Sequence, residues 1–166
     1  MKGALLEGLA PVVDANTRFI VLGSFPGVAS LQAQQYYGHP RNHFWPILSA
    51  LWGVDLMAAP YATRLIEVRR RGLGLWDVYA SCRREGSLDS AIEQAQLNDL
   101  AGLQRLTPKL RAIAHNGAES ARAMVHTRAL GAAVHRLPST SPANASWSFE
   151  RKLAAWRAAF QEHGIA

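Results

Sequence analysis

The fold of this chain is decided first by residues 18–23, RFIVLG, a run of apolar and β-branched residues that a glycine ends. A short apolar run bounded by a breaker residue predicts a buried strand. Runs of similar character lie at residues 73–79, 111–115 and 133–137. The sequence therefore predicts four strands, the first of them buried.

Helical patterns lie between and after these strands. Helices are predicted at residues 43–52, 61–71, 87–106 and 117–130, with one more near the C-terminal end. That last helix carries a single apolar stripe, formed by Phe149, Leu153, Trp156 and Phe160.

The alternation of strands and helices indicates parallel strand pairing, with helices on both faces of the sheet. We therefore predict an α/β fold, a single three-layer αβα domain over residues 1–166 with a central four-stranded, mainly parallel sheet. Ligands of such folds bind beyond the carboxyl ends of the strands. Functional residues are thus expected in the loops at 24–41, 116–117 and 138–146, and just after Val78.

The composition is that of a globular protein, because 49% of the residues are hydrophobic and 18% are charged. No apolar run approaches the length of a membrane span. The first seven residues include Glu7 and lack the apolar core of a signal peptide, so we expect a soluble, cytoplasmic protein. The one cysteine, Cys82, can form neither an internal disulfide nor a four-cysteine iron–sulfur cluster.

The charge balance is basic, with 18 lysines and arginines against 12 acidic residues and a net charge of +6. A basic balance suits a polyanionic partner such as nucleic acid. Two arginine clusters, Arg69–Arg71 and Arg83–Arg84, could follow a phosphate backbone, or they could lie on solvated faces.

The histidine pattern gives no sign of a metal centre. The six histidines are His39, His43, His115, His126, His135 and His163. Only the first two lie four residues apart, and Pro40 between them disfavours a helix there. We therefore expect no metal and no cofactor.

Two longer motifs are distinctive. The first is GSFPG at residues 23–27, followed by QYYGHPRNHFW at residues 35–45, and the second is LPSTSPAN at residues 137–144. Together they resemble the uracil-DNA glycosylase superfamily, and most closely its hypoxanthine-DNA glycosylase branch, family 6. The resemblance spans about residues 17–160, nearly the whole chain.

The resemblance implies a base excision repair enzyme that acts on DNA containing deaminated bases. Such an enzyme flips hypoxanthine out of the duplex and hydrolyses the N-glycosidic bond of deoxyinosine, which leaves an abasic site. It is expected to be a monomer with no membrane association. Two alternatives stay open: a uracil or mismatch-specific glycosylase of the same superfamily, and a non-catalytic nucleic-acid-binding domain.

Cleavage of the abasic site by the same enzyme is not expected. Schiff-base chemistry needs a lysine at the site, and the only lysines, Lys2, Lys109 and Lys152, lie outside both motifs. The sequence therefore predicts a monofunctional DNA N-glycosylase.

One departure from the superfamily pattern concerns the catalytic residue. Most members carry Asp or Asn before the proline of the first motif, where this chain has Phe25. In the hypoxanthine branch the resemblance assigns catalysis to the asparagine of the HPxN element, here Asn42. Its carboxamide could orient the attacking water, although Asn42 could instead cap the helix that follows.

Five residues are expected to contact the base: Ser24, Phe25, Tyr37, Asp77 and Asn116. The resemblance assigns stacking on the flipped base to Tyr37, for which Phe25 and Tyr36 are the competing rings. Asn116 could read the donor and acceptor edge of hypoxanthine, or it could belong to an Asn-Gly turn. Asp77 could accept a base N–H, or it could pair with an arginine.

Nine residues are expected to contact DNA: Gly23, Pro26, Gly27, Ser139, Thr140, Ser141, Pro142, Ala143 and Asn144. Gly23 and Gly27 permit a close approach of the backbone. The hydroxyl groups of the second motif suit phosphates. Pro142 and Ala143 form a compact apolar wedge for the space that the base vacates.

Overall fold

The computed structural model describes residues 3–166. Its central sheet is built from four parallel strands: β2 (Phe19–Gly23), β3 (Leu73–Asp77), β6 (Ala112–Asn116) and β7 (Ala133–Leu137). They lie in the order β3-β2-β6-β7. This confirms the predicted α/β fold, and all four strands were predicted from their apolar runs.

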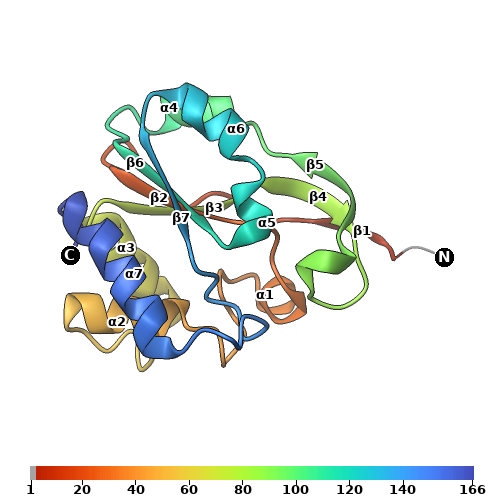
Figure 1. Ribbon diagram of the computed structural model, residues 1–166, viewed down its shortest axis with the longest axis horizontal. Coiled ribbons are helices and arrows are strands. Elements are labelled where there is room, and N and C mark those ends of the chain that lie inside the picture. Colours follow the sequence, from red (N-terminus) through yellow and green to blue (C-terminus); the bar gives the residue numbers. More distant parts are fainter. Residues whose placement is uncertain (1–2) are drawn as a thin grey trace.

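Helices cover both faces of this sheet (Figure 1). One face packs against α2 (Phe44–Trp52), α3 (Tyr61–Arg70) and α7 (Phe149–Glu162). The other packs against α4 (Leu103–Leu106) and the region of α6 (Met124–Thr127). Alternate side chains of β2 separate the two cores: Phe19 and Val21 belong to the first, Ile20 and Leu22 to the second.

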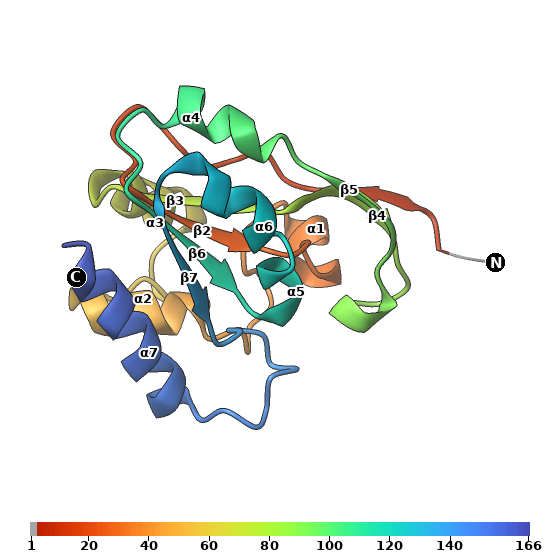
Figure 2. The same ribbon diagram turned by 45° about the horizontal axis from the view of Figure 1, so that its top comes forward.

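A second, antiparallel sheet extends from the first and was not predicted. It consists of β1 (Leu5–Glu7), β4 (Tyr79–Arg83) and β5 (Glu93–Leu97), with β4 in the middle. The chain passes from β3 through Val78 directly into β4, so the predicted strand at 73–79 continues into a different sheet. Figure 2 shows β4 and β5 running together to the side of the molecule where the N-terminus lies.

The predicted helix at residues 87–106 is wrong for most of its length. The structure has the 3-10 turn η1 (Asp89–Ala91), then β5, the 3-10 turn η2 (Leu100–Gly102) and α4. The sequence of β5, EQAQL, is made of good helix formers. Pairing with β4 overrides that local preference, because strand propensity depends mainly on the neighbouring strand.

Two further differences are smaller. A short helix, α1 (Val28–Ala33), lies within the predicted loop at 24–41. The predicted helix at 117–130 is divided into α5 (Ala118–Ala121), α6 and the 3-10 turn η3 (Arg128–Leu130). Within residues 3–166, no helix is both long enough and apolar enough to cross a membrane.

Candidate active site

A cavity of about 800 Å³ lies at the carboxyl edge of the central sheet. Its lining includes the last residue of each of the four parallel strands, Gly23, Asp77, Asn116 and Leu137. Parallel strands present their carboxyl ends at one edge, where this fold class binds ligands. The volume falls within the range of small-molecule pockets, roughly 300–1,000 Å³, and suits a nucleoside.

Both motifs line this cavity. All of the residues that the sequence analysis assigned to catalysis, base contact and DNA contact are found in the lining. The structure therefore brings together residues that lie more than a hundred positions apart in the chain, such as Ser24 and Asn144.

Asn116 links the second motif to the end of β6. Its Nδ2 donates to Oγ1 of Thr140 at 3.0 Å and to Oη of Tyr37 at 3.2 Å, and its Oδ1 accepts from the Thr140 N–H at 3.0 Å. Both amide hydrogens of Asn116 are thus used, which leaves one lone pair of Oδ1 for a base. Thr140 is only 1% exposed, so its hydroxyl faces Asn116 rather than a place where a phosphate could reach it.

Tyr37 has its ring on the cavity wall. It stacks on Phe44 with a centroid separation of 4.1 Å and an interplanar angle of 25°, and burial raises the pKa of its hydroxyl. Tyr36, the competing ring, is buried in the core and donates its hydroxyl to the carbonyl of Ala10. Its ring is therefore less available to a base than that of Tyr37.

Phe25 is packed beneath a buried arginine. Its ring lies 5.4 Å from the guanidinium carbon of Arg84, which is 5% exposed and donates to the carbonyls of Pro26 and Gly86. Arg84 therefore holds the first motif in place and does not follow a DNA backbone. At a position where most of the superfamily has a polar residue, this chain has an apolar contact.

The other predicted arginine cluster lies away from the site. It precedes β3, so it is at the amino edge of the sheet, opposite the cavity. Arg70 and Arg71 form ion pairs with Glu67, and Arg71 lies over the ring of Trp52. A role of Arg69–Arg71 in following DNA at this site is therefore not supported by their position.

Four residues of the cavity lining were missed because their segment was predicted as a helix. They are Ser87, Leu88, Asp89 and Ser90. Oγ of Ser24 donates to Oδ1 of Asp89 at 2.6 Å, and Oγ of Ser87 accepts from the Val28 N–H. The structure thus links the first motif to η1, which no local pattern in the sequence indicated.

Asp77 is a buried carboxyl group at the end of β3. It is 5% exposed, its Oδ2 is buried without a hydrogen-bond partner among the described residues, and Oδ1 lies against Gly23. Burial, reinforced by the charge of Asp89, raises the pKa of Asp77 to about 7. In the chain from residue 3 onward Asp77 forms no ion pair, although the positive charge of Arg84 acts on it at longer range and partly opposes the rise in its pKa.

Asn42 lies at the start of α2 and faces the cavity. The helix begins at Phe44 with His43 as its N-cap residue, and Oδ1 of Asn42 accepts from the Phe44 N–H at 2.9 Å. Asn42 thus forms a capping bond one residue earlier than a standard cap. An amide oxygen has two lone pairs, so the same atom can also accept from a water in the cavity.

Lys152 joins the two motifs to α7, and the sequence analysis had assigned it no role. It is 1% exposed, and its Nζ lies 3.2 Å from Nδ1 of His43 and 3.4 Å from the carbonyl of Ser141. The His43 N–H donates to the carbonyl of Thr140 at 2.9 Å. Among residues 3–166 no lysine lines the cavity: Lys109 contacts Asn16, and Lys2 lies outside the described residues.

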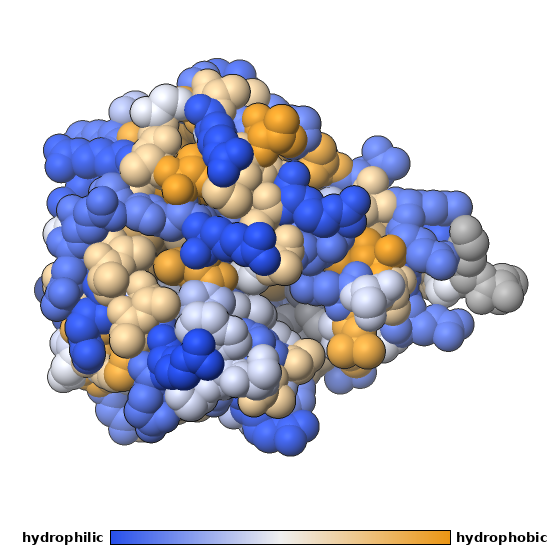
Figure 3. Space-filling view, in the orientation of Figure 1, coloured by the Kyte–Doolittle hydropathy of each residue, from blue (hydrophilic) through white to orange (hydrophobic). Residues whose placement is uncertain are grey.

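The rim of the cavity offers a basic group and a small apolar tip. Arg136 is exposed and belongs to the lining, as do half-buried Pro142 and exposed Ala143. The face of the molecule seen in Figure 3 is mainly hydrophilic, and its apolar residues form small separate patches. A polar, charged partner suits this surface better than an apolar one.

Comparisons with known proteins agree with this arrangement. The profile of the Uracil DNA glycosylase superfamily matches residues 10–162. Two proteins named hypoxanthine DNA glycosylase are similar over 93% of this chain and 98% of their own: the one from Methanosarcina barkeri is 37% identical, the one from Methanosarcina acetivorans 38%. A solution NMR structure of a Methanosarcina acetivorans protein, described as a candidate uracil DNA glycosylase, is 37% identical and superposes with a TM-score of 0.87 over 97% of this chain and 99% of that one.

Proposed function

The chain belongs to the uracil DNA glycosylase superfamily, and on that premise we propose that it excises hypoxanthine from deoxyinosine in DNA. It is a DNA glycosylase, a hydrolase of N-glycosyl bonds. The choice of hypoxanthine is supported by the names of the two relatives at 37% and 38% identity. We further propose that residues 1–166 act as one domain, as a monomer and in the cytoplasm. The free, buried thiol of Cys82 is compatible with that compartment, because the cytosol keeps thiols reduced.

One observation carries the proposal: two motifs from opposite ends of the chain line one nucleoside-sized cavity, which also contains a buried carboxyl group. A base inside a duplex cannot be reached, so the target nucleotide must first leave the stack. We assign Pro142 and Ala143, which line the cavity, to filling the gap. Arg136 at the cavity rim is placed to contact a phosphate.

Water activation is assigned to Asn42. Cleavage of the glycosidic bond puts positive charge on the sugar and negative charge on the leaving base, so a weak nucleophile suffices if it is held in place. The free lone pair of Asn42 Oδ1 can hold a water, and the bond to the Phe44 N–H fixes the orientation of the amide. Asn42 cannot take the proton itself, because an amide does not titrate near neutral pH.

Stabilisation of the leaving base is assigned to Asp77. With a pKa of about 7, a large share of this carboxyl group is neutral at physiological pH. A neutral carboxyl donates an O–H, and hypoxanthine offers acceptors at O6 and N7. Donation by Asp77 would stabilise the electron pair that the base takes from the broken bond, while Tyr37 supports the ring face.

Uracil remains the second candidate substrate, favoured by membership of the superfamily itself. Against it stands Phe25, whose ring under Arg84 cannot hold water where most of the superfamily uses an acid or amide. A non-catalytic DNA-binding domain is the third candidate, and Phe25 is the feature that favours it.

A single-turnover assay separates these candidates. Enzyme in excess is mixed with duplexes that carry deoxyinosine, deoxyuridine or no damage, and alkali-labile sites are counted. We expect abasic sites at deoxyinosine and an intact strand until alkali is added, as a monofunctional enzyme requires. Faster release of uracil than of hypoxanthine would favour a uracil glycosylase. Binding to DNA without any cleavage would favour a non-catalytic DNA-binding domain.

A further inference from the structure

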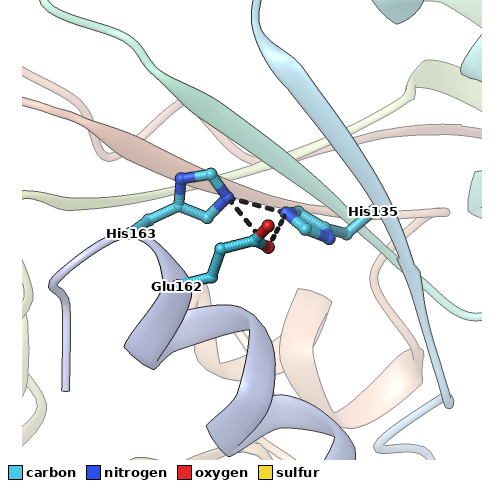
Figure 4. A group of neighbouring side chains, drawn as sticks. All are labelled: His135, Glu162 and His163. Carbon is cyan, nitrogen blue, oxygen red and sulfur yellow. Dashed lines mark hydrogen bonds and ion pairs between the residues drawn. The ribbon is translucent and has the colours of Figure 1, made fainter.

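Three potential metal ligands meet at the C-terminal end of α7, outside the cavity. They are His135 from the edge strand β7, Glu162 at the end of α7, and His163, the residue that follows (Figure 4). Nε2 of His135 lies 2.8 Å from Nε2 of His163. Oε2 of Glu162 lies 3.3 Å from the first nitrogen and 3.5 Å from the second.

The backbone beneath these side chains is held in place by the core. Phe19 is fully buried and lies under both imidazoles, with centroid separations of 6.4 Å to His135 and 5.7 Å to His163. The chain after His163 turns at Gly164, where φ is +68°, and Ile165 is then buried with its carbonyl accepting from Nε1 of Trp52. The two imidazoles therefore sit on an ordered support.

The distances fit a tetrahedral cation. With metal–nitrogen and metal–oxygen bonds of about 2.0–2.2 Å, two ligand atoms of a tetrahedron lie about 3.3–3.6 Å apart. Both nitrogen–oxygen separations, 3.3 and 3.5 Å, lie in this range. The nitrogen–nitrogen separation of 2.8 Å has to widen by only about half an ångström, which small side-chain rotations supply.

We propose that His135, Glu162 and His163 form a binding site for one divalent transition-metal ion, of which zinc fits best. Two imidazoles and one carboxylate are the ligands that zinc prefers, and they leave the fourth position for a water. The side chain of Glu162 is 61% exposed, so an ion can enter from solvent, whereas His135 and His163 are 22% and 15% exposed. The sequence could not indicate this site, because His135 is 28 residues from His163 and no ligand motif joins them.

The bound ion would fasten α7 to the edge of the central sheet. It would tie the last turn of the helix to β7, whereas the cavity is lined by other residues at the carboxyl ends of the strands. The site is therefore structural, and it is independent of the glycosylase chemistry proposed above. Removing the ion should lower thermal stability and leave the single-turnover rate unchanged.

The experiment uses the full chain after treatment with a chelator and dialysis. Zinc is titrated by isothermal calorimetry, and long-range 1H–15N NMR spectra follow the ring nitrogens of all six histidines. We expect one ion per chain, with shifts confined to His135 and His163. Thermal unfolding should move upward by roughly 5–10 °C once free zinc exceeds its dissociation constant about 100-fold.

Three variants locate the site. His135→Gln and His163→Gln should each weaken zinc binding by at least about 10-fold, since even outer-shell partners of a metal have an effect of that size. His126→Gln is the matched control: it removes an exposed histidine on α6 and should bind zinc as the wild type does. Because the NMR measurement is made on the wild type, the test holds even if one variant folds poorly.

Two results would overturn the proposal. Absence of a one-to-one zinc complex would mean that the histidines form a hydrogen-bonded imidazole pair only. A complex that shifts other histidines, or that survives both His135→Gln and His163→Gln, would place the ion elsewhere. Loss of glycosylase activity on chelation would contradict the purely structural role of the ion. The proposal that the substrate is deoxyinosine would be unaffected by that result.

Discussion

Asn116 and Thr140 are joined by two hydrogen bonds that run in opposite directions between the end of β6 and the second motif. The Thr140 N–H donates to Oδ1 of Asn116, and Nδ2 of Asn116 donates to Oγ1 of Thr140, each at 3.0 Å. A third bond leads from the same Nδ2 to Tyr37. One buried amide therefore sets the position of the Tyr37 ring and of the second motif, to which we assign base stacking and DNA contact.

Replacing that amide should loosen the site. Asn116→Ala removes three hydrogen bonds and leaves the buried Thr140 N–H without its partner, so the free energy of unfolding should fall by about 2–4 kcal/mol. Urea denaturation measures this loss of free energy of unfolding. The single-turnover rate should fall as well. Thr140→Val is the control that loses only one acceptor and should cost about 1 kcal/mol. A change below about 0.5 kcal/mol in Asn116→Ala would show that the linkage contributes little.

Asn42→Ala should reduce the chemical step by about 10²–10³-fold, the effect of losing one preorganised polar group. Binding to a duplex with an uncleavable deoxyinosine analogue should hardly change, because Asn42 is assigned to water rather than DNA. The lost bond to the Phe44 N–H should also lower stability by about 1 kcal/mol. Single-turnover kinetics and binding are measured separately.

The cap of α7 supplies the matched control for Asn42. Oγ of Ser148 accepts from the Arg151 N–H, so Ser148→Ala loses a comparable capping bond at a residue that does not line the cavity. The Ser148→Ala variant should be less stable than the wild type and should keep the wild-type single-turnover rate. If Asn42→Ala behaves in the same way, Asn42 is a structural cap and the water must be held by another residue.

Asp77→Asn should stabilise the protein, and more so as the pH rises. Below about pH 3 the carboxyl group is mostly neutral in both the folded and the unfolded wild type. Between the unfolded pKa of 3.8 and the folded pKa of about 7, the unfolded chain releases a proton that the folded chain keeps, so the wild type loses stability. At pH 8 the variant should be more stable by up to about 4 kcal/mol.

The same titration should appear in the rate. If the neutral form of Asp77 donates to the leaving base, the single-turnover rate of the wild type falls as the pH rises through about 7. Asp77→Asn cannot titrate, so its rate should be lower but without that step. A wild-type rate that rises through the same range would assign the active role to the carboxylate instead.

The tip of the second motif should matter more in duplex DNA than in single-stranded DNA. Replacing Pro142 and Ala143 by glycine removes the apolar wedge at the cavity rim. A single strand has no stack to fill, so cleavage of duplex deoxyinosine should fall more than cleavage of single-stranded deoxyinosine. The ratio of the two single-turnover rates is the measurement, and equal losses would refute the wedge.

Arg136 should contribute to the salt dependence of DNA binding. It is exposed at the cavity rim, so Arg136→Ala should weaken binding and reduce the slope of log affinity against log salt by about 1. Arg69, at the opposite edge of the sheet, is the matched control, and Arg69→Ala should leave the slope unchanged. If Arg69→Ala has the larger effect, the DNA lies across the other side of the molecule.

The sequence alone determined the central sheet and the location of the site. Three of its strands, β2, β3 and β6, are buried along their whole length, and such strands are stable only between two layers of helices. Parallel strands then require the loops that follow them to meet at one edge. The two motifs were therefore predicted to lie together, and the structure confirms it.

Only the tertiary structure decided those features in which a residue depends on a contact with a residue distant in the sequence. Residues 93–97 favour a helix locally, but they form a strand because β4 offers them an edge. Asp77 could have paired with an arginine; its burial without one is a property of the folded core. Likewise His135 and His163 meet only because α7 packs back along β7. Local periodicity determines which helices and strands form, whereas packing determines which side chains come into contact. The chemistry of this protein depends on those side-chain contacts.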